Sequence, residues 1–382
     1  MNTEPLNPEA SSTFPEGIPL ARPRVADPAR VAADVEAILR SGVLTNGPYV
    51  RRFEEETAAY LGVKHCVAVS SCTSGLMLVL RAAELSGDVI APSFTFAATA
   101  HAIDWNGLRP VFADIDRRTL TLSPASVERA ITVHTSAILA THIYGTPCDV
   151  ESLQTVASES GVRLFFDAAH AFGSIHNGNK VGGFGDAEVF SLSPTKVVVA
   201  AEGGLITTND DLLAERCRIG RDYGNPGDYD CRFVGLNARM SELHAATALA
   251  SLSDLEERLL ERNRLAAVYT AELADVPGIV IPEVSSGDRS TYKDYSILID
   301  PEGFGLGAGP VGKALSLAGV ETRRYYSPPV HAMQAYRSVA GSAGVLPVTE
   351  WASLRALTLP LWVGMTDTQV RAVAGHIRRI RP

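Results

Sequence analysis

Residues 65–80 read HCVAVSSCTSGLMLVL, a short β-branched run followed by hydroxyl residues and then by an apolar helical pattern. The first part predicts a buried strand over 65–71, and the last part predicts a helix over 74–86. The same unit recurs along the chain. Further strands are predicted at 88–94, 109–116, 136–144, 163–170, 187–193 and 203–210, and a further helix at 95–107. Strands that alternate with helices predict an α/β protein with a mixed, mostly parallel central sheet.

Two more helices are predicted on the N-terminal side of this unit. Apolar residues recur at helical spacing through Val31, Val35 and Ile38, and the pattern stops at Gly42. A second helix is predicted over 51–62, where Gly62 ends it. Glycine is common directly after the last turn of a helix because it adopts the left-handed conformation without steric cost.

The composition changes after about residue 240. The stretch 241–276 is rich in Ala, Leu and charged residues and predicts one long helix, and a strand at 295–300, a glycine-rich loop and another helix follow. Residues 1–17 are polar and contain three prolines. We therefore expect a flexible N-terminal arm (1–17), a large domain (18–250) and a small C-terminal α+β domain (251–382).

Charge and cysteine usage exclude several classes of function. The net charge of −9 at pH 7 argues against nucleic acid as the main partner. The five cysteines are scattered and form no CxxC pair, so neither a zinc site nor a disulfide framework is predicted. No stretch approaches 18 consecutive apolar residues, and the N-terminus has no apolar core of signal-peptide length. We expect a cytoplasmic protein with no membrane partner and no metal.

Chemically useful side chains follow several predicted strands. Thr73 and Ser74 stand at a helix N-terminus, where hydroxyls and free N–H groups bind anions, although an ordinary N-cap has the same sequence. Asp167 ends an apolar run, where a buried carboxylate needs a protonated ring nitrogen, an arginine or a capped helix as its partner. Ser191 and Lys196 follow another strand.

A phosphate cradle, a buried carboxylate and a buried lysine together are what pyridoxal 5′-phosphate requires. The helix N-terminus would take the phosphate, and the carboxylate would keep the pyridine nitrogen protonated. The lysine would form the Schiff base, and desolvation would lower its pKa toward a proton-shuttling range. Since ligands of open α/β sheets lie at the carboxyl ends of the strands, the three elements are expected to meet there.

Seven stretches in order carry a resemblance to a known family: PSFTFAATA (92–100), THIYGTP (141–147), FFDAAHAFGS (165–174), FSLSPTK (190–196), EGG (202–204), GLNARMSELHAA (235–246) and YYSPPVH (325–331). With them, nearly the whole chain from about residue 42 to the last helix resembles the sugar-nucleotide aminotransferase family of DegT/StrS type. Members of that family are pyridoxal phosphate enzymes of fold type I, so the resemblance implies that fold and transaminase activity.

The resemblance implies a role for each matching residue around the ring of the cofactor. Lys196 would bind the cofactor covalently and act as general acid and base. Asp167 would pair with the pyridine nitrogen, and His170 matches a position near the ring that holds Gln or His. Phe96 would stack on the face of the ring.

The resemblance also implies roles at the phosphate and at the subunit interface. Thr73, the Ser74 backbone and the Ser191 hydroxyl would take the phosphate. Asn237 matches an asparagine that reaches the phosphate from the neighbouring subunit, which implies a homodimer with its active sites at the interface. Three departures from the family leave the subfamily open: Cys72 stands where glycine is usual, Val197 where asparagine often follows the lysine, and Ala200-Ala201 where Thr-Gly is frequent.

The implied reaction moves an amino group from L-glutamate, through pyridoxamine phosphate, to a nucleotide-linked keto sugar. His331 and Tyr326 would contact the substrate. We expect the acceptor to be dTDP-4-keto-6-deoxy-D-glucose, aminated at C4 in deoxyaminosugar biosynthesis for an antibiotic or a surface glycan. A 3-keto-sugar aminotransferase of the same family and a cofactor-dependent sugar dehydratase are the alternatives. Family dehydratases carry histidine at the lysine position, so Lys196 favours transamination.

Two other classes of protein, a nucleotide-sugar dehydrogenase or epimerase and a regulatory protein, fit the sequence less well than an aminotransferase does. GFGLGA (303–308) with Glu321 imitates a dinucleotide-binding fingerprint, but only about 80 residues follow it, too few for that domain. Tyr60 and Lys64 imitate a short-chain dehydrogenase pair but precede every predicted strand. A regulatory protein on an aminotransferase fold predicts loss of the lysine, the aspartate or the cradle, and all three are present.

Overall fold

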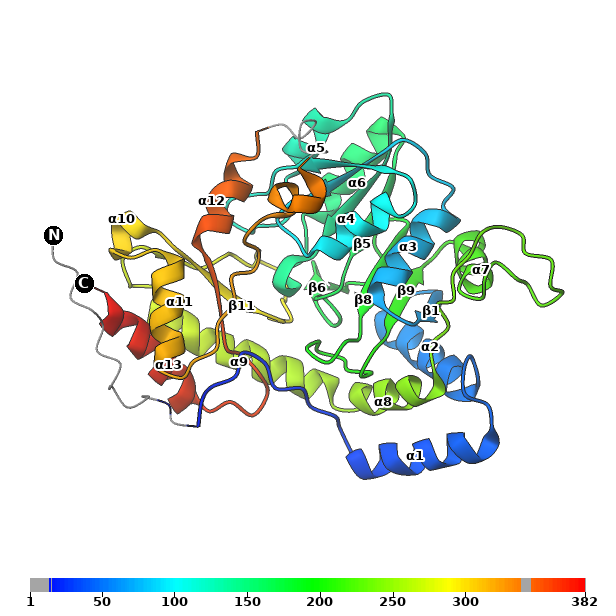
Figure 1. The fold of residues 1–382 in the computed structure, drawn as a ribbon, viewed down its shortest axis with the longest axis horizontal. Helices are drawn as coiled ribbons and strands as arrows, with labels where there is room; N and C mark the ends of the chain where they lie inside the picture. The colour runs from blue at the N-terminus through cyan, green and yellow to red at the C-terminus, as the bar shows by residue number, and fades with distance from the viewer. Residues whose placement is uncertain (1–13, 15, 338–344, 382) are drawn as a thin grey trace.

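The computed structural model describes residue 14, residues 16–337 and residues 345–381, and its larger part is built on a seven-stranded sheet (Figure 1). The strand order is β1-β9-β8-β5-β4-β2-β3. The strands are β1 (His65–Val69), β2 (Asp88–Pro92), β3 (Arg109–Ala113), β4 (Thr135–Thr141), β5 (Arg163–Asp167), β8 (Ala187–Ser191) and β9 (Gly204–Thr208). Strand β9 is antiparallel to β1 and β8, and the other pairs are parallel. The predicted mixed, mostly parallel sheet is confirmed.

Helices cover both faces of this sheet because the strands are apolar on both sides. Val189 and Ile206 pack with α3, whereas their neighbours Phe190 and Leu205 pack with α2 and α8 on the opposite face. The helices of this part are α1 (Pro28–Ser41), α2 (Pro48–Leu61), α3 (Cys72–Ala82), α4 (Ala97–Asp104), α5 (Pro124–Ala130), α6 (Val150–Ser160), α7 (Asp211–Gly220) and α8 (Glu242–Leu252). Gly42 and Gly62 adopt left-handed conformations after α1 and α2, as the sequence predicts.

A second, smaller sheet lies beside α11 and α13 at one end of the molecule (Figure 1). Its antiparallel strands are β10 (Ile279–Val280), β11 (Tyr295–Ile299) and β12 (Ala356–Leu359). The remaining elements are α9 (Leu255–Leu273), α10 (Pro301–Phe304), α11 (Ala308–Leu317), α12 (Pro347–Arg355) and α13 (Asp367–Ile380), the ribbon β6 (Ile175–His176) and β7 (Asn179–Lys180), and the short η1 (Ile143–Gly145), η2 (Val330–Ala332) and η3 (Gln334–Tyr336). No described helix is long and apolar enough to cross a membrane.

A separate apolar cluster forms the core of this smaller part. Ile18 and buried residues between 265 and 377 build it, and two of its members, Tyr269 and Tyr295, stack on each other. Partly buried Phe14 packs against the same cluster. The predicted boundaries at residues 17 and 250 stay predictions, and residues 1–13 and 15 of the predicted arm lie outside the described residues.

The stretch 241–276, predicted as one helix, is two helices that are separated at Ser253 and Asp254. Buried Arg258 explains the interruption. Its guanidinium donates to the carbonyl oxygens of Ser251 and Val197 and to Oδ1 of Asp254 at 2.7 Å. Since a carbonyl at the end of a helix needs a donor from outside the helix, the arginine stabilises the break.

Buried Glu242, the first residue of α8, caps another helix from a distance. Its carboxylate accepts from the N–H groups of Gly47, Tyr49 and Val50 at 2.8 to 3.0 Å, around Pro48 at the start of α2. The first N–H groups of a helix have no partner within it, so this carboxylate supplies one. Helix α2 therefore begins at Pro48, three residues earlier than predicted from the sequence.

Replacing Glu242 by alanine is expected to lower the free energy of unfolding by roughly 1–3 kcal/mol, because it leaves buried donors unpaired. The urea midpoint of the variant measures the loss. Glu36→Ala is the matched control, since Glu36 lies on exposed α1 and forms only a surface ion pair with Arg40. Equal midpoints for the two variants would show that the cap adds nothing.

Candidate active site

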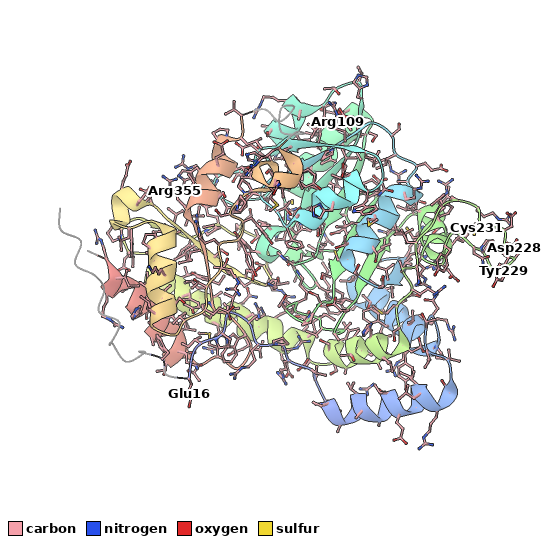
Figure 2. The ribbon with its side chains drawn as sticks, viewed as in Figure 1. Glu16, Arg109, Asp228, Tyr229, Cys231 and Arg355 are labelled. Carbon is pink, nitrogen blue, oxygen red and sulfur yellow. The ribbon has the colours of Figure 1, made fainter. Side chains whose placement is uncertain are left out.

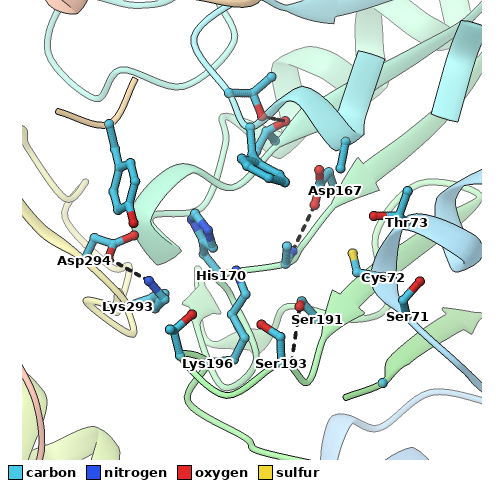
Figure 3. A pocket seen from close by; sticks show the side chains of 18 of the residues that line it. Ser71, Cys72, Thr73, Asp167, His170, Ser191, Ser193, Lys196, Lys293 and Asp294 are labelled. Atoms are coloured by element: carbon cyan, nitrogen blue, oxygen red, sulfur yellow. Dashed lines mark hydrogen bonds and ion pairs between the residues drawn. The ribbon is translucent and has the colours of Figure 1, made fainter. Parts of the chain in front are cut away.

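A cavity of about 310 Å³ lies where β4, β5 and β8 end at the carboxyl edge of the sheet, and Figure 3 shows its lining. It brings together seven of the residues predicted from the sequence: Thr73, Phe96, Asp167, His170, Ser191, Lys196 and Tyr326. Ser74, Asn237 and His331 do not line it. Asn237 is exposed, and His331 is bonded through Nδ1 to the Ser93 hydroxyl at 2.6 Å.

The N-terminus of α3 opens into one end of the cavity. Ser71 caps the helix by accepting from the Ser74 N–H at 3.0 Å, so the Ser74 backbone is already engaged. The N–H groups of Cys72 and Thr73 have no acceptor among the described residues. Strand β9 passes close by, since a Cβ at Gly204 would lie 2.4 Å from the Ser71 backbone. Free N–H groups at a helix start, with the Ser191 hydroxyl beside them in the cavity, suit a phosphate.

The Asp167 carboxylate is buried at the end of β5. Its Oδ2 accepts from the Thr99 hydroxyl at 2.7 Å, and its Oδ1 accepts from the Ala169 N–H at 3.1 Å. The hydroxyl of Thr95 links Thr99 to Thr141 at 2.9 and 3.2 Å. Burial raises the pKa of the Asp167 carboxyl despite these donors. A cation next to the Asp167 carboxylate would lower this pKa and so favour the ionised form.

Lys196 lies on the loop after β8, and its ammonium forms no hydrogen bond or ion pair with the part of the chain that the structure describes. Burial and the nearby Lys293 charge lower its pKa to about 8, against opposing effects of Asp294, Cys72 and Asp167. A buried amine with a lowered pKa is a better nucleophile and proton carrier at neutral pH than a surface lysine.

His170 is neutral in this cavity. Its Nδ1 accepts from the Tyr144 N–H at 3.2 Å, which leaves the ring proton on Nε2. Burial and the charges of Lys196 and Lys293 hold its pKa well below the usual value. The ring therefore presents a donor to the cavity without adding charge.

The lowered pKa of Lys196 predicts how the protein captures an aldehyde. Because only the neutral amine attacks a carbonyl carbon, the rate at which cofactor-free protein binds pyridoxal phosphate should rise with pH, with a midpoint near the pKa of about 8. Stopped-flow absorbance from pH 6 to 10 measures it, a range chosen to span roughly two units on either side. A midpoint near the pKa of ordinary lysine would contradict the burial effect.

Two charged residues of the cavity were missed in the sequence analysis. Lys293 and Asp294 form an ion pair of 2.7 Å just before β11, and both are buried. The sequence contained little sign of them, because Lys293 and Asp294 end the polar stretch SSGDRSTYKD (285–294), where charged residues are ordinary. Nothing in the neighbouring sequence predicted that this ion pair would lie in the same cavity as Lys196.

Four observations show that these residues fit pyridoxal phosphate. Free N–H groups of α3 and the Ser191 hydroxyl suit its phosphate, and the buried Asp167 carboxylate lacks the cation that a protonated pyridine nitrogen would supply. The unpaired Lys196 amine suits its aldehyde. Phe96 lines the cavity but is 62% exposed, so its ring is free to stack on the aromatic ring of a cofactor. No cluster of three or more metal-ligating side chains occurs in the described ranges.

Comparison with known proteins finds similarity to sugar aminotransferases over most of the chain. The family model described as "DegT/DnrJ/EryC1/StrS aminotransferase family" matches residues 26–378. The dTDP-4-amino-4,6-dideoxy-D-glucose transaminase of Escherichia coli is 33% identical over 353 residues, 92% of this chain and 95% of that protein. The GDP-perosamine synthase of Vibrio cholerae is 35% identical over 340 residues, 88% and 92% of the two chains. The crystal structure of DesI with its TDP-sugar product superposes with a TM-score of 0.92 at 40% identity and covers 97% and 94% of the two chains.

Proposed function

Since this chain belongs to the DegT/DnrJ/EryC1/StrS family of pyridoxal phosphate-dependent sugar aminotransferases, we propose that it transfers the amino group of L-glutamate to C4 of dTDP-4-keto-6-deoxy-D-glucose. The observation that carries the chemistry is one cavity that holds an unpaired lysine amine and a buried carboxylate. Both groups have pKa values shifted toward their neutral forms, which is typical of catalytic sites.

Some residues of the cavity would bind the cofactor, and others would transfer protons. Bound pyridoxal phosphate would supply the electron sink for cleavage of a C–H bond, with pyridoxamine phosphate as the amino carrier. Lys196 Nζ would bind the aldehyde carbon and, once released, move the proton of the donor's amino-bearing carbon. The Asp167 carboxylate would hold the proton of the pyridine nitrogen. Thr73 N–H and the Ser191 hydroxyl would anchor the phosphate, and Phe96 would cover one face of the ring.

The choice of sugar rests on the relatives. The E. coli relative is a transaminase named for a dTDP-linked 4-amino-4,6-dideoxyglucose, and the DesI structure was determined in the presence of its TDP-sugar product. The V. cholerae relative is named for GDP-perosamine and favours a second candidate, a GDP-linked keto sugar. A dehydratase is disfavoured, because Lys196 lies in the cavity as a transaminase requires.

A substrate panel tests this proposal. The purified protein is incubated with glutamate and a dTDP-4-keto, a dTDP-3-keto or a GDP-4-keto 6-deoxyhexose, and 2-oxoglutarate and the amino sugar are measured. The proposal expects the highest kcat/KM with the dTDP-4-keto sugar. Turnover of only the 3-keto or only the GDP-linked sugar would overturn the substrate, and no turnover with any of them would overturn the proposed function.

We also propose that the protein is a cytoplasmic homodimer in which Asn237 reaches the phosphate site of the partner. The exposed Asn237 follows a protruding loop, which carries Asp228, Tyr229 and Cys231 at the edge of the molecule (Figure 2). Tyr229 is almost fully exposed, as an apolar side chain in a subunit interface would be in the isolated chain. Sedimentation equilibrium tests the dimer.

A further inference from the structure

A buried pair of opposite charges faces the proposed active site from the smaller part of the molecule. Lys293 and Asp294 lie before β11, are 8% and 6% exposed, and line the same cavity as Lys196. Figure 3 shows them on the side of Lys196 and His170 away from Asp167 and Thr73. The proposed cofactor would occupy the end of the cavity with Asp167 and Thr73, which leaves the pair beside the space for the substrate.

Half of the Asp294 carboxylate lacks a partner. Oδ1 accepts from Lys293 Nζ at 2.7 Å, whereas the buried Oδ2 has no donor among the described residues. A buried carboxylate oxygen without a donor is unfavourable, so this site has unused acceptor capacity. The terminal torsion of an aspartate side chain is broad, so a small rotation presents this oxygen to the cavity.

The charge of the pair selects the kind of group that it binds. Lys293 supplies further N–H donors and Asp294 supplies an acceptor, and together they carry no net charge. A carboxylate of the amino donor has only acceptors and would be repelled by Asp294. A sugar hydroxyl both donates and accepts and would satisfy both partners.

The pair is also near enough to Lys196 to act on its pKa, which Lys293 lowers and Asp294 raises. Lys196, Lys293 and Asp294 line one cavity, so a substrate carbon in reach of Lys196 Nζ would have its neighbouring substituents in the space that the pair borders. We propose that Lys293 and Asp294 recognise the hydroxyl next to the carbon that is aminated, which is the C3 hydroxyl of a 4-keto sugar. This inference rests on the proposed function and adds which hydroxyl of the sugar Lys293 and Asp294 bind.

The test separates the two half-reactions of the holoenzyme. Addition of glutamate alone measures the donor half by absorbance, and the sugar half is then measured by single turnover with dTDP-4-keto-6-deoxyglucose and with its 3-deoxy analogue. Asp294→Asn keeps the shape but loses the charged acceptor. We expect kcat/KM of the sugar half to fall by about 10- to 100-fold with the parent sugar, as for loss of a hydrogen bond to a charged group. With the 3-deoxy analogue, wild type and variant should be nearly equal.

Asp288→Asn is the matched control. Asp288 has a side chain that is 1% exposed and an equally unpartnered Oδ2, but it pairs with His176 outside this cavity. It should leave both half-reactions unchanged. Lys293→Met is the second variant and should also lose discrimination between the two sugars, so the test does not depend on the folding of one protein.

Two results would overturn the inference. One is an equal loss on the parent sugar and the 3-deoxy analogue in Asp294→Asn and Lys293→Met, and the other is a donor half that falls as much as the sugar half. Both leave the proposed function standing, because wild type would still complete the two half-reactions. Failure of the donor half in wild type would instead refute the proposed function.

Discussion

Lys196→Ala is expected to abolish turnover. Loss of the proton transfer alone should reduce kcat by about 10²–10⁴-fold, and the protein would also lose the amine that binds the aldehyde. The amine has no partner among the described residues, so its removal breaks no structural contact of the ammonium and should leave the thermal midpoint nearly unchanged. The effect is therefore chemical rather than structural.

Borohydride reduction followed by mass spectrometry gives a readout that does not depend on activity. Wild type with pyridoxal phosphate should carry the reduced cofactor on the peptide that contains Lys196, and Lys196→Ala should carry none. Lys196→Arg keeps the charge but cannot bind the aldehyde, so it should behave like the alanine variant. Lys313→Ala, on the exposed side of α11, is the control and should be labelled and active. Substantial turnover in Lys196→Ala would refute the assignment of the catalytic lysine.

The second large effect is expected from Asp167→Asn. The substitution keeps the size of the side chain and the bond with Thr99 but removes the charge that would hold the pyridine nitrogen protonated. Loss of a preorganised charge opposite the reacting group should lower kcat by about 10²–10³-fold. Lys196 remains, so reduction should still trap the cofactor on its peptide. Capture without turnover distinguishes this variant from Lys196→Ala.

The stability of Asp167→Asn gives an independent check. Burial raises the pKa of the Asp167 carboxyl, so above its folded pKa the ionised group costs folding free energy when no cation is present. Without cofactor at neutral pH, the variant should be as stable as wild type or more so. With cofactor, wild type should gain more thermal stability than the variant. Thr99→Val should reduce kcat far less, since it removes one neutral donor. Near-wild-type turnover in Asp167→Asn would contradict the proposed role of the charge.

Much of the fold was predictable because its signals are local. Alternating short apolar runs and helical patterns were enough to predict the α/β class, and Gly42 and Gly62 were enough to end two helices. The candidate site was partly predictable for a related reason. In a parallel sheet the carboxyl ends of strands meet at one edge, so polar residues after several apolar runs could be expected to converge, as Asp167 and Lys196 do.

Other features depend on residues that are far apart in the chain. Glu242 sets the start of α2 from almost 200 residues away, and Arg258 stabilises the break between α8 and α9 by donating to the Ser251 carbonyl while it also binds the distant Val197 carbonyl. Lys293 and Asp294 reach the cavity because the segment before β11 is tied to the loop after β5, where the Thr291 hydroxyl donates to the His170 carbonyl at 2.6 Å. Composition and periodicity describe only neighbours along the chain, whereas burial, pKa and the free oxygen of Asp294 arise from contacts through space.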